Sequence, residues 1–149
     1  MEETMLQKFL ECLYQSARLN DVLFQRELTK GEFGVIEVVH FKHEEKGCPV
    51  SVNDLADTML CRPPAISRIL RGLEMKGFVE RSINKEDRRG IHVTLTEEGE
   101  KIRRREESYQ GDMFQKVVEK LGDEKLGTFL DVWREMLDTY VETAGDHGE

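Results

Sequence analysis

Residues 51–99 read SVNDLADTMLCRPPAISRILRGLEMKGFVERSINKEDRRGIHVTLTEEG, and this stretch decides the fold. Ser51 is a good N-cap, with Asp54 three residues on, and the apolar spacing predicts a short helix after it. A turn over residues 60–63 and a second helix that begins at the two prolines follow. Two alternating runs follow, at residues 78–81 and 91–95, and they are typical of strands with one buried face. The order is a helix-turn-helix followed by a β-hairpin. The first helix is expected to face inward through Val52, Leu55, Ala56, Met59 and Leu60.

The helix after the turn carries the main functional signal. Proline suits its first turn, because the ring pre-sets φ and the missing N–H would be unbonded there. One side is a buried stripe that recurs at Ile66, Ile69, Leu70 and Leu73. The other side is basic, and a helix with such a face fits the major groove of DNA. For this helix alone, a solvated face of a packing helix remains the alternative. The candidate DNA-binding residues are Arg62, Pro64, Ser67, Arg68 and Arg71.

The loop between the two strands, residues 82–90 (SINKEDRRG), is the tip of the expected hairpin. Three cations near the tip, Lys85, Arg88 and Arg89, can reach a phosphate backbone or a minor groove, where arginine is favoured. Asp87 stands among them, and DNA would repel its charge, so we assign it the role of holding an arginine in place. The hairpin and the helix together predict a surface for double-stranded DNA.

The distribution of charge supports this surface. The chain has 149 residues and a formal net charge of −8, which alone would argue against a nucleic-acid partner. Residues 61–105, however, contain 12 Lys and Arg against 7 Asp and Glu, whereas the rest of the chain contains 10 against 23. Such asymmetry attracts DNA to one surface and repels it elsewhere.

Several short motifs follow one another through residues 54–99. They are Asp54-Leu55-Ala56, Ala65-Ile66-Ser67-Arg68, Leu73-Glu74, Lys76-Gly77, Val79-Glu80-Arg81, Asp87-Arg88-Arg89 and Leu95-Thr96-Glu97-Glu98-Gly99. In this order and at these spacings they resemble the MarR family of bacterial winged helix-turn-helix transcription regulators. The family usually has small hydroxyl residues where this chain has Pro63-Pro64, and this difference removes candidate phosphate contacts from the start of the helix.

The resemblance implies a mainly α fold with about six helices and a small β-hairpin wing. One domain is expected, with a winged-helix DNA-binding lobe at residues 28–99 and a helical dimerisation lobe from residues 1–27 and 100–144. The resemblance also implies a triangular dimer with a ligand cleft between the two kinds of lobe. A ligand in that cleft would change the separation of the two DNA-binding helices.

The helices outside the central stretch have broad apolar stripes. Thr29 and Glu32 form a capping box, and Thr96 caps a helix of about 25 residues whose densely charged start, residues 97–107, is expected to span solvent. The first and last helices cannot bury their stripes completely against each other, so a two-fold dimer is predicted. Completion of a monomer core is the alternative. The candidate dimerisation residues are Leu6, Phe9, Leu13, Phe129, Trp133, Met136 and Tyr140.

Composition excludes other classes of protein. No run approaches the roughly 18 apolar residues that a membrane span needs, and the acidic start MEETMLQKFLECLYQ is unlike a signal peptide. Three widely spaced cysteines fit a reducing compartment, which predicts a cytoplasmic protein with no membrane partner. The chain has no glycine-rich phosphate loop, CxxC or HExxH motif, so we predict a non-enzyme without a cofactor.

We therefore expect a homodimeric regulator that binds an inverted-repeat operator, represses transcription and is released by a small ligand. Three alternatives remain open. Cys12, or Cys61 beside Arg62, could sense oxidants. The group His40, His43, Glu44 and Cys48 could sense zinc, although the ligand set is too inexact for us to assign a metal site. A winged helix that binds only proteins is the third alternative.

Overall fold

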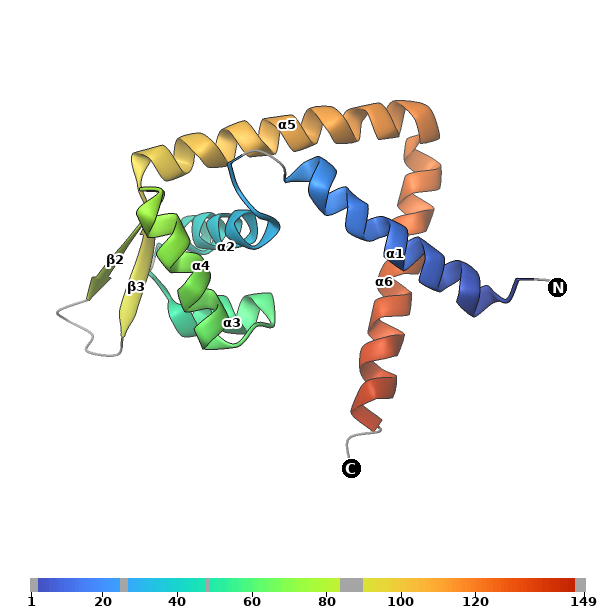
Figure 1. Ribbon diagram of the computed structural model, residues 1–149, viewed down its shortest axis with the longest axis horizontal. Helices are drawn as coiled ribbons and strands as arrows, with labels where there is room; N and C mark the ends of the chain where they lie inside the picture. The colour runs from blue at the N-terminus through green and yellow to red at the C-terminus, as the bar shows by residue number, and fades with distance from the viewer. Residues whose placement is uncertain (1–2, 25–26, 48, 84–89, 147–149) are drawn as a thin grey trace. The chain divides into compact units, whose positions relative to one another are not determined.

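The structure is a computed structural model that describes residues 3–24, 27–47, 49–83 and 90–146. The chain forms two compact units, residues 1–106 and 107–149. The elements are α1 (Met5–Leu23), α2 (Lys30–Lys46), β1 (Val50–Ser51), α3 (Val52–Met59), α4 (Pro63–Met75), β2 (Val79–Ile83), β3 (Ile91–Leu95), α5 (Glu97–Leu121) and α6 (Asp123–Asp146) (Figure 1). The expected mainly α fold with a small wing is confirmed.

The starts of α2 and α3 show why these helices begin where they do. The Thr29 hydroxyl accepts from the Glu32 amide at 3.2 Å, and the Glu32 carboxylate accepts from the Thr29 amide at 2.9 Å. Ser51 and Asp54 exchange two equivalent bonds of 3.0 Å at the start of α3. Each pair satisfies backbone groups that the first turn leaves unbonded, so the predicted caps at both helices are confirmed.

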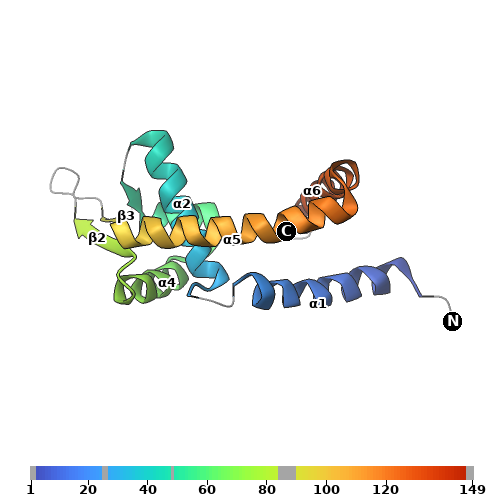
Figure 2. The same ribbon diagram turned by 90° about the horizontal axis from the view of Figure 1, so that it is seen from above.

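The wing is part of a three-stranded sheet in the order β1-β3-β2. Strands β2 and β3 are antiparallel, with Val79 opposite Leu95 and Ile83 opposite Ile91. Strand β1 adds to the other edge of β3 through Val50 and Ser51. The sequence predicted only a two-stranded hairpin, because two residues are too few to show alternation. Figure 2 shows β2 and β3 projecting beyond α2 and α4.

A single apolar core unites α2, α3, α4 and the sheet. Side chains from each helix meet one face of the sheet there, and Ile102 of α5 joins them at 1% exposure. This core fixes α4, because Ile66, Leu70 and Leu73 of its inward stripe have no accessible surface left and Ile69 packs against them half-buried. The fully buried side chains include Ile36, Leu55, Ile66, Leu70, Leu73, Val35, Val50 and Val93.

Two sequence-based expectations are wrong. Leu60 does not face inward: it is 93% exposed and takes a left-handed conformation, with φ 52°, at the end of α3. The start of α5 does not span solvent, because Gly99, Ile102, Arg103 and Glu106 are buried. Burial of Arg103 is tolerated because its Nε lies 3.1 Å from Glu100 Oε2, and its Nη1 lies 3.6 Å from Glu37 Oε1.

The first and last helices expose much of their apolar surface. None of the residues of α1, all of them described, is buried. Leu6 on α1 is 60% exposed, and Phe129 and Tyr140 on α6 are 56% and 54% exposed. Within α6, the rings of Phe129 and Trp133 stack with centroids 6.0 Å apart. Among the described residues, no helix combines the length and the apolar character that crossing a membrane requires.

Candidate nucleic-acid interface

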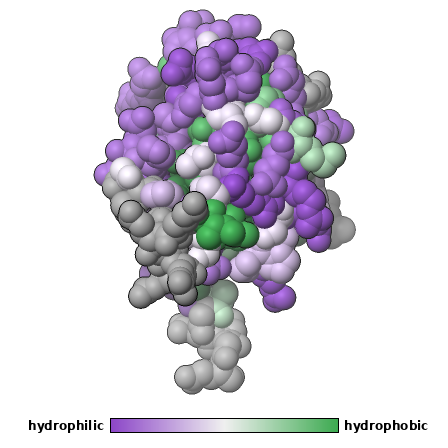
Figure 3. Space-filling view, turned by 90° about the vertical axis from the view of Figure 1, so that its left-hand side faces the viewer, coloured by the Kyte–Doolittle hydropathy of each residue, from purple (hydrophilic) through white to green (hydrophobic). Residues whose placement is uncertain are grey.

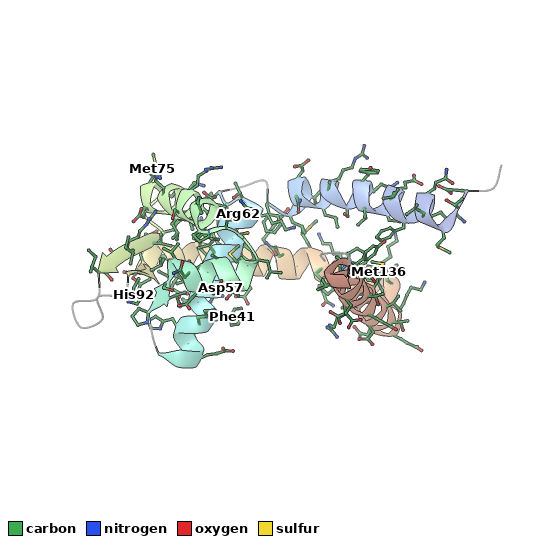
Figure 4. The ribbon with its side chains drawn as sticks, turned by 90° about the horizontal axis from the view of Figure 1, so that it is seen from below. Phe41, Asp57, Arg62, Met75, His92 and Met136 are labelled. Carbon is green, nitrogen blue, oxygen red and sulfur yellow. The ribbon has the colours of Figure 1, made fainter. Side chains whose placement is uncertain are left out.

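Helix α4 presents the predicted DNA-binding side chains on its accessible side. Pro64, Arg68 and Arg71 are exposed and recur at the spacing of one helix face. Arg62, also exposed, is the N-cap and makes no capping hydrogen bond with its side chain. Figure 4 shows Arg62 and Met75 at opposite ends of α4. Arg68 and Arg71 thus share one accessible face and Arg62 stands at the start of the same helix, and guanidinium groups bind phosphates and guanine edges well.

Ser67 differs from the other candidates on α4, because it is half-buried rather than exposed. Its carbonyl oxygen accepts a hydrogen bond of 3.1 Å from Nη2 of Arg81 on β2. Nε of the same arginine lies 3.1 Å from Glu74 Oε1. Arg81 therefore joins the wing to α4 at two points. The sequence showed Arg81 within a family motif but assigned it no role, because an alternating strand does not identify what its inward polar residue contacts.

Lys76 fixes the other end of α4. Its Nζ donates to both carboxylate oxygens of Glu32, at 2.9 and 2.7 Å, and to the backbone oxygen of Glu27 at 2.9 Å. Glu32 is only 8% exposed, so the pair is shielded from solvent more than a surface ion pair. The start of α2 and the end of α4 are thus held together.

The described part of the wing consists of its two strands and Gly90. The candidates Lys85, Asp87, Arg88 and Arg89 lie outside the described residues. The paired strands end in Ile83 and Ile91, which are 75% and 41% exposed. Figure 3 shows the face of the molecule on the side of β2 and β3, where mostly hydrophilic surface surrounds a small hydrophobic area.

A second polar cluster lies between α2 and the start of α5. Nδ1 of His40 is 3.0 Å from Glu100 Oε1, and Arg103 contacts the other oxygen of this carboxylate. Burial would raise the pKa of Glu100, but the hydrogen bonds with His40 and Arg103 outweigh burial and hold the pKa below its ordinary value of 4.5. A cavity of about 170 Å³ adjoins the cluster, lined by Val39, His40, His43, Glu44, Thr94, Leu95 and Glu100.

This cluster does not support the zinc alternative. The part of the chain that the structure describes contains no group of three or more His, Cys, Asp or Glu residues placed to hold a metal ion. Cys48, one of the four ligands considered, lies outside that part. The two thiols of the redox alternative, Cys12 and Cys61, are free and exposed. Sγ of Cys61 donates to the backbone oxygen of Met59 at 3.3 Å.

Comparisons with known proteins agree with this arrangement. A model of the MarR family matches residues 43–91, from the end of α2 to the start of β3. The uncharacterized HTH-type transcriptional regulator YpoP of Bacillus subtilis is 26% identical over 134 residues, which cover 90% of this chain and 89% of YpoP. The HTH-type transcriptional repressor YetL of Bacillus subtilis is 29% identical over 144 residues, covering 85% of this chain and 84% of YetL.

Solved structures share the fold. The crystal structure of the S. aureus MepR–DNA complex superposes with a TM-score of 0.69 and 22% identity, covering 92% of this chain and 96% of MepR. These relatives and structural neighbours are transcription regulators, not enzymes. The family model and the relatives that match the chain over most of its length together show that it belongs to the MarR family of DNA-binding transcription regulators.

Proposed function

We propose that the protein is a homodimeric repressor that binds an inverted-repeat operator through α4 and the wing. The observation that carries this proposal is the exposed line of Pro64, Arg68 and Arg71 on a helix whose opposite side buries Ile66, Leu70 and Leu73. MepR, which shares the fold, has been crystallised with DNA, and YetL is named a repressor. Such a function requires the compartment that holds the chromosome, so we place the protein in the cytoplasm.

Dimerisation is proposed because α1 and α6 expose apolar side chains, and this exposure to water is unfavourable for a monomer. A two-fold pair would cover these faces and present two copies of α4 to half-sites about 10 bp apart, centre to centre. The candidate contacts remain Leu6, Phe9 and Leu13 on α1 and Phe129, Trp133, Met136 and Tyr140 on α6.

Nuclease footprinting of the promoter region of the protein's own gene tests DNA binding. We expect a protected palindrome, with weaker protection when both Arg68 and Arg71 are changed to alanine. Light scattering after size exclusion tests the dimer, and Trp133→Glu is expected to shift the mass toward the monomer. If the double arginine variant protects DNA as the wild type does, α4 is not the contact helix, and a monomeric wild type would refute the dimer.

Release by a small molecule is the further part of the proposal. A ligand that binds one conformation of the dimer more tightly changes the population that can hold both half-sites. Phenolic acids, zinc and peroxide are the probes, scored by the thermal midpoint and by operator affinity. An inducer should raise the midpoint and lower the affinity together. If no probe alters either quantity, release by these classes of signal is excluded, including the oxidant and zinc alternatives.

A further inference from the structure

Resting on the proposed DNA-binding function, we propose that the start of α4 contacts the 5-methyl groups of thymine in the major groove. The contact surface consists of the exposed rings of Pro63 and Pro64. These residues would make the protein sensitive to a single methyl group on the DNA. The sensitivity would add to the attraction that the arginines of α4 have for phosphates and guanine edges.

Within the described first turn of α4, residues 63–66, the backbone has no free amide to offer. A helix usually presents four unbonded N–H groups at its start, and these are ready donors for phosphate or base acceptors. Here Pro63 and Pro64 occupy the first two positions and have no N–H. The amides of Ala65 and Ile66 both donate to the carbonyl oxygen of Arg62, at 2.9 and 3.3 Å. The backbone of this first turn therefore has no amide left to donate to a base or a phosphate.

Beside the Arg62 side chain, the exposed surface at the start of α4 is apolar. Both proline rings are accessible, and neither can donate or accept a hydrogen bond. The base edges of the major groove offer one apolar group, the C5 methyl of thymine. Pro64 precedes Arg68 and Arg71 by one and two turns on the same face, so a helix bound through those cations would also bring the proline ring to the groove.

The test removes the methyl group and nothing else. Duplexes of 30 bp are first selected from a random library with the full-length wild-type protein. Each thymine of a selected duplex is then replaced singly by deoxyuridine, and affinity is measured by fluorescence anisotropy. Loss of one buried methyl contact should weaken binding about four-fold at one or two positions in each half-site. Other positions should change little.

Two variants assign the effect to the prolines. Serine is tolerated at helix starts, so Pro63→Ser and Pro64→Ser should fold, which circular dichroism and the thermal midpoint will show. At the sensitive positions, the ratio of thymine to deoxyuridine affinity should fall toward one in at least one variant. Pro49→Ser is the matched control, because Pro49 is exposed but lies before β1. It should keep the full ratio.

Three results would overturn the inference. Wild-type protein could bind every deoxyuridine duplex as tightly as its parent, both α4 variants could keep the wild-type ratio, or Pro49→Ser could lose it as well. Each of these results leaves duplex binding itself intact. Failure of the library to yield any bound duplex would instead refute the proposed function, so the two failures are distinguishable.

Discussion

The guanidinium of Arg81 on β2 donates a hydrogen bond of 3.1 Å to the carbonyl oxygen of Ser67 on α4. The same side chain pairs with Glu74, seven residues further along the helix. Seven residues are almost two turns, so the wing holds α4 at two separated points and resists its rotation about its own axis. Helix orientation decides which side chains reach base edges. Arg81 is therefore expected to act through α4 rather than by touching DNA.

Arg81→Ala should lower the unfolding free energy by about 1 kcal/mol, since it removes a hydrogen bond and a partly shielded ion pair. It should also weaken DNA binding, because α4 is less well fixed. Arg68→Ala, on the exposed side of the same helix, should weaken binding as much or more while it changes the unfolding free energy by less than about 0.5 kcal/mol. Urea denaturation and fluorescence anisotropy measure the two quantities. Normal stability of Arg81→Ala would contradict the positioning role.

The cluster around Glu100 makes stability depend on pH. Its pKa in the folded protein lies below the ordinary value of 4.5, which it regains on unfolding. The folded state therefore holds the ionised form more strongly. Stability from Glu100 is fully present above the ordinary value and is lost as the pH falls through the lowered folded value.

The variant Glu100→Gln isolates this effect. The difference in unfolding free energy between wild type and variant should shrink as the pH falls below 4.5. Urea denaturation of both proteins from pH 3 to pH 7 measures it. A difference that stays the same across this range would show that the contacts with His40 and Arg103 do not favour the ionised carboxyl.

The elements that the sequence predicted well are those whose signals are local. Helix α4 begins at its prolines and buries Ile66, Leu70 and Leu73, because a stripe at helical spacing has only one way to face a core. The caps at Thr29 and Ser51 depend on residues three apart, and such contacts can be read without knowledge of the fold.

The errors arise where distant residues decide the outcome. The start of α5 is densely charged, yet Arg103 is buried because Glu37, 66 residues earlier, approaches it from α2. Strand β1 forms because Val50 pairs with Val93 on β3. The bridge from Arg81 to α4 likewise depends on the turn that brings β2 back along the helix. Only the assembled core places these partners together.

Leu60 occupies a backbone conformation that favours glycine. Its φ of 52° brings Cβ close to the following carbonyl oxygen, and this contact destabilises a residue other than glycine by roughly 1–2 kcal/mol. Its side chain is 93% exposed and gains almost nothing from burial. Leu60→Gly should therefore raise the unfolding free energy by about 0.5–1 kcal/mol, after the greater freedom of glycine in the unfolded chain is subtracted.

Leu60→Ala is the matched control, because it removes the exposed side chain but keeps the strained Cβ. Its unfolding free energy should stay within about 0.5 kcal/mol of the wild type. Urea denaturation at one fixed protein concentration compares all three proteins, since dimerisation would make stability depend on concentration. Equal stabilisation by glycine and alanine would show that the exposed side chain, not the backbone, is unfavourable.

Two glycines of α5 should respond to alanine in opposite directions. A Cβ on Gly99 would overlap the carbonyl oxygen of Phe78, whereas a Cβ on Gly111 would meet no atom within 4 Å. That oxygen cannot move away freely, because it accepts a hydrogen bond of 3.1 Å from the amide of Thr96, just before α5 begins. Gly99→Ala should thus lower the unfolding free energy by about 1–3 kcal/mol, and Gly111→Ala should raise it by about 0.5–1 kcal/mol through helix propensity. Urea denaturation at equal protein concentration distinguishes them, and a Gly99→Ala variant as stable as the wild type would show that α5 does not pack so closely against the start of the wing.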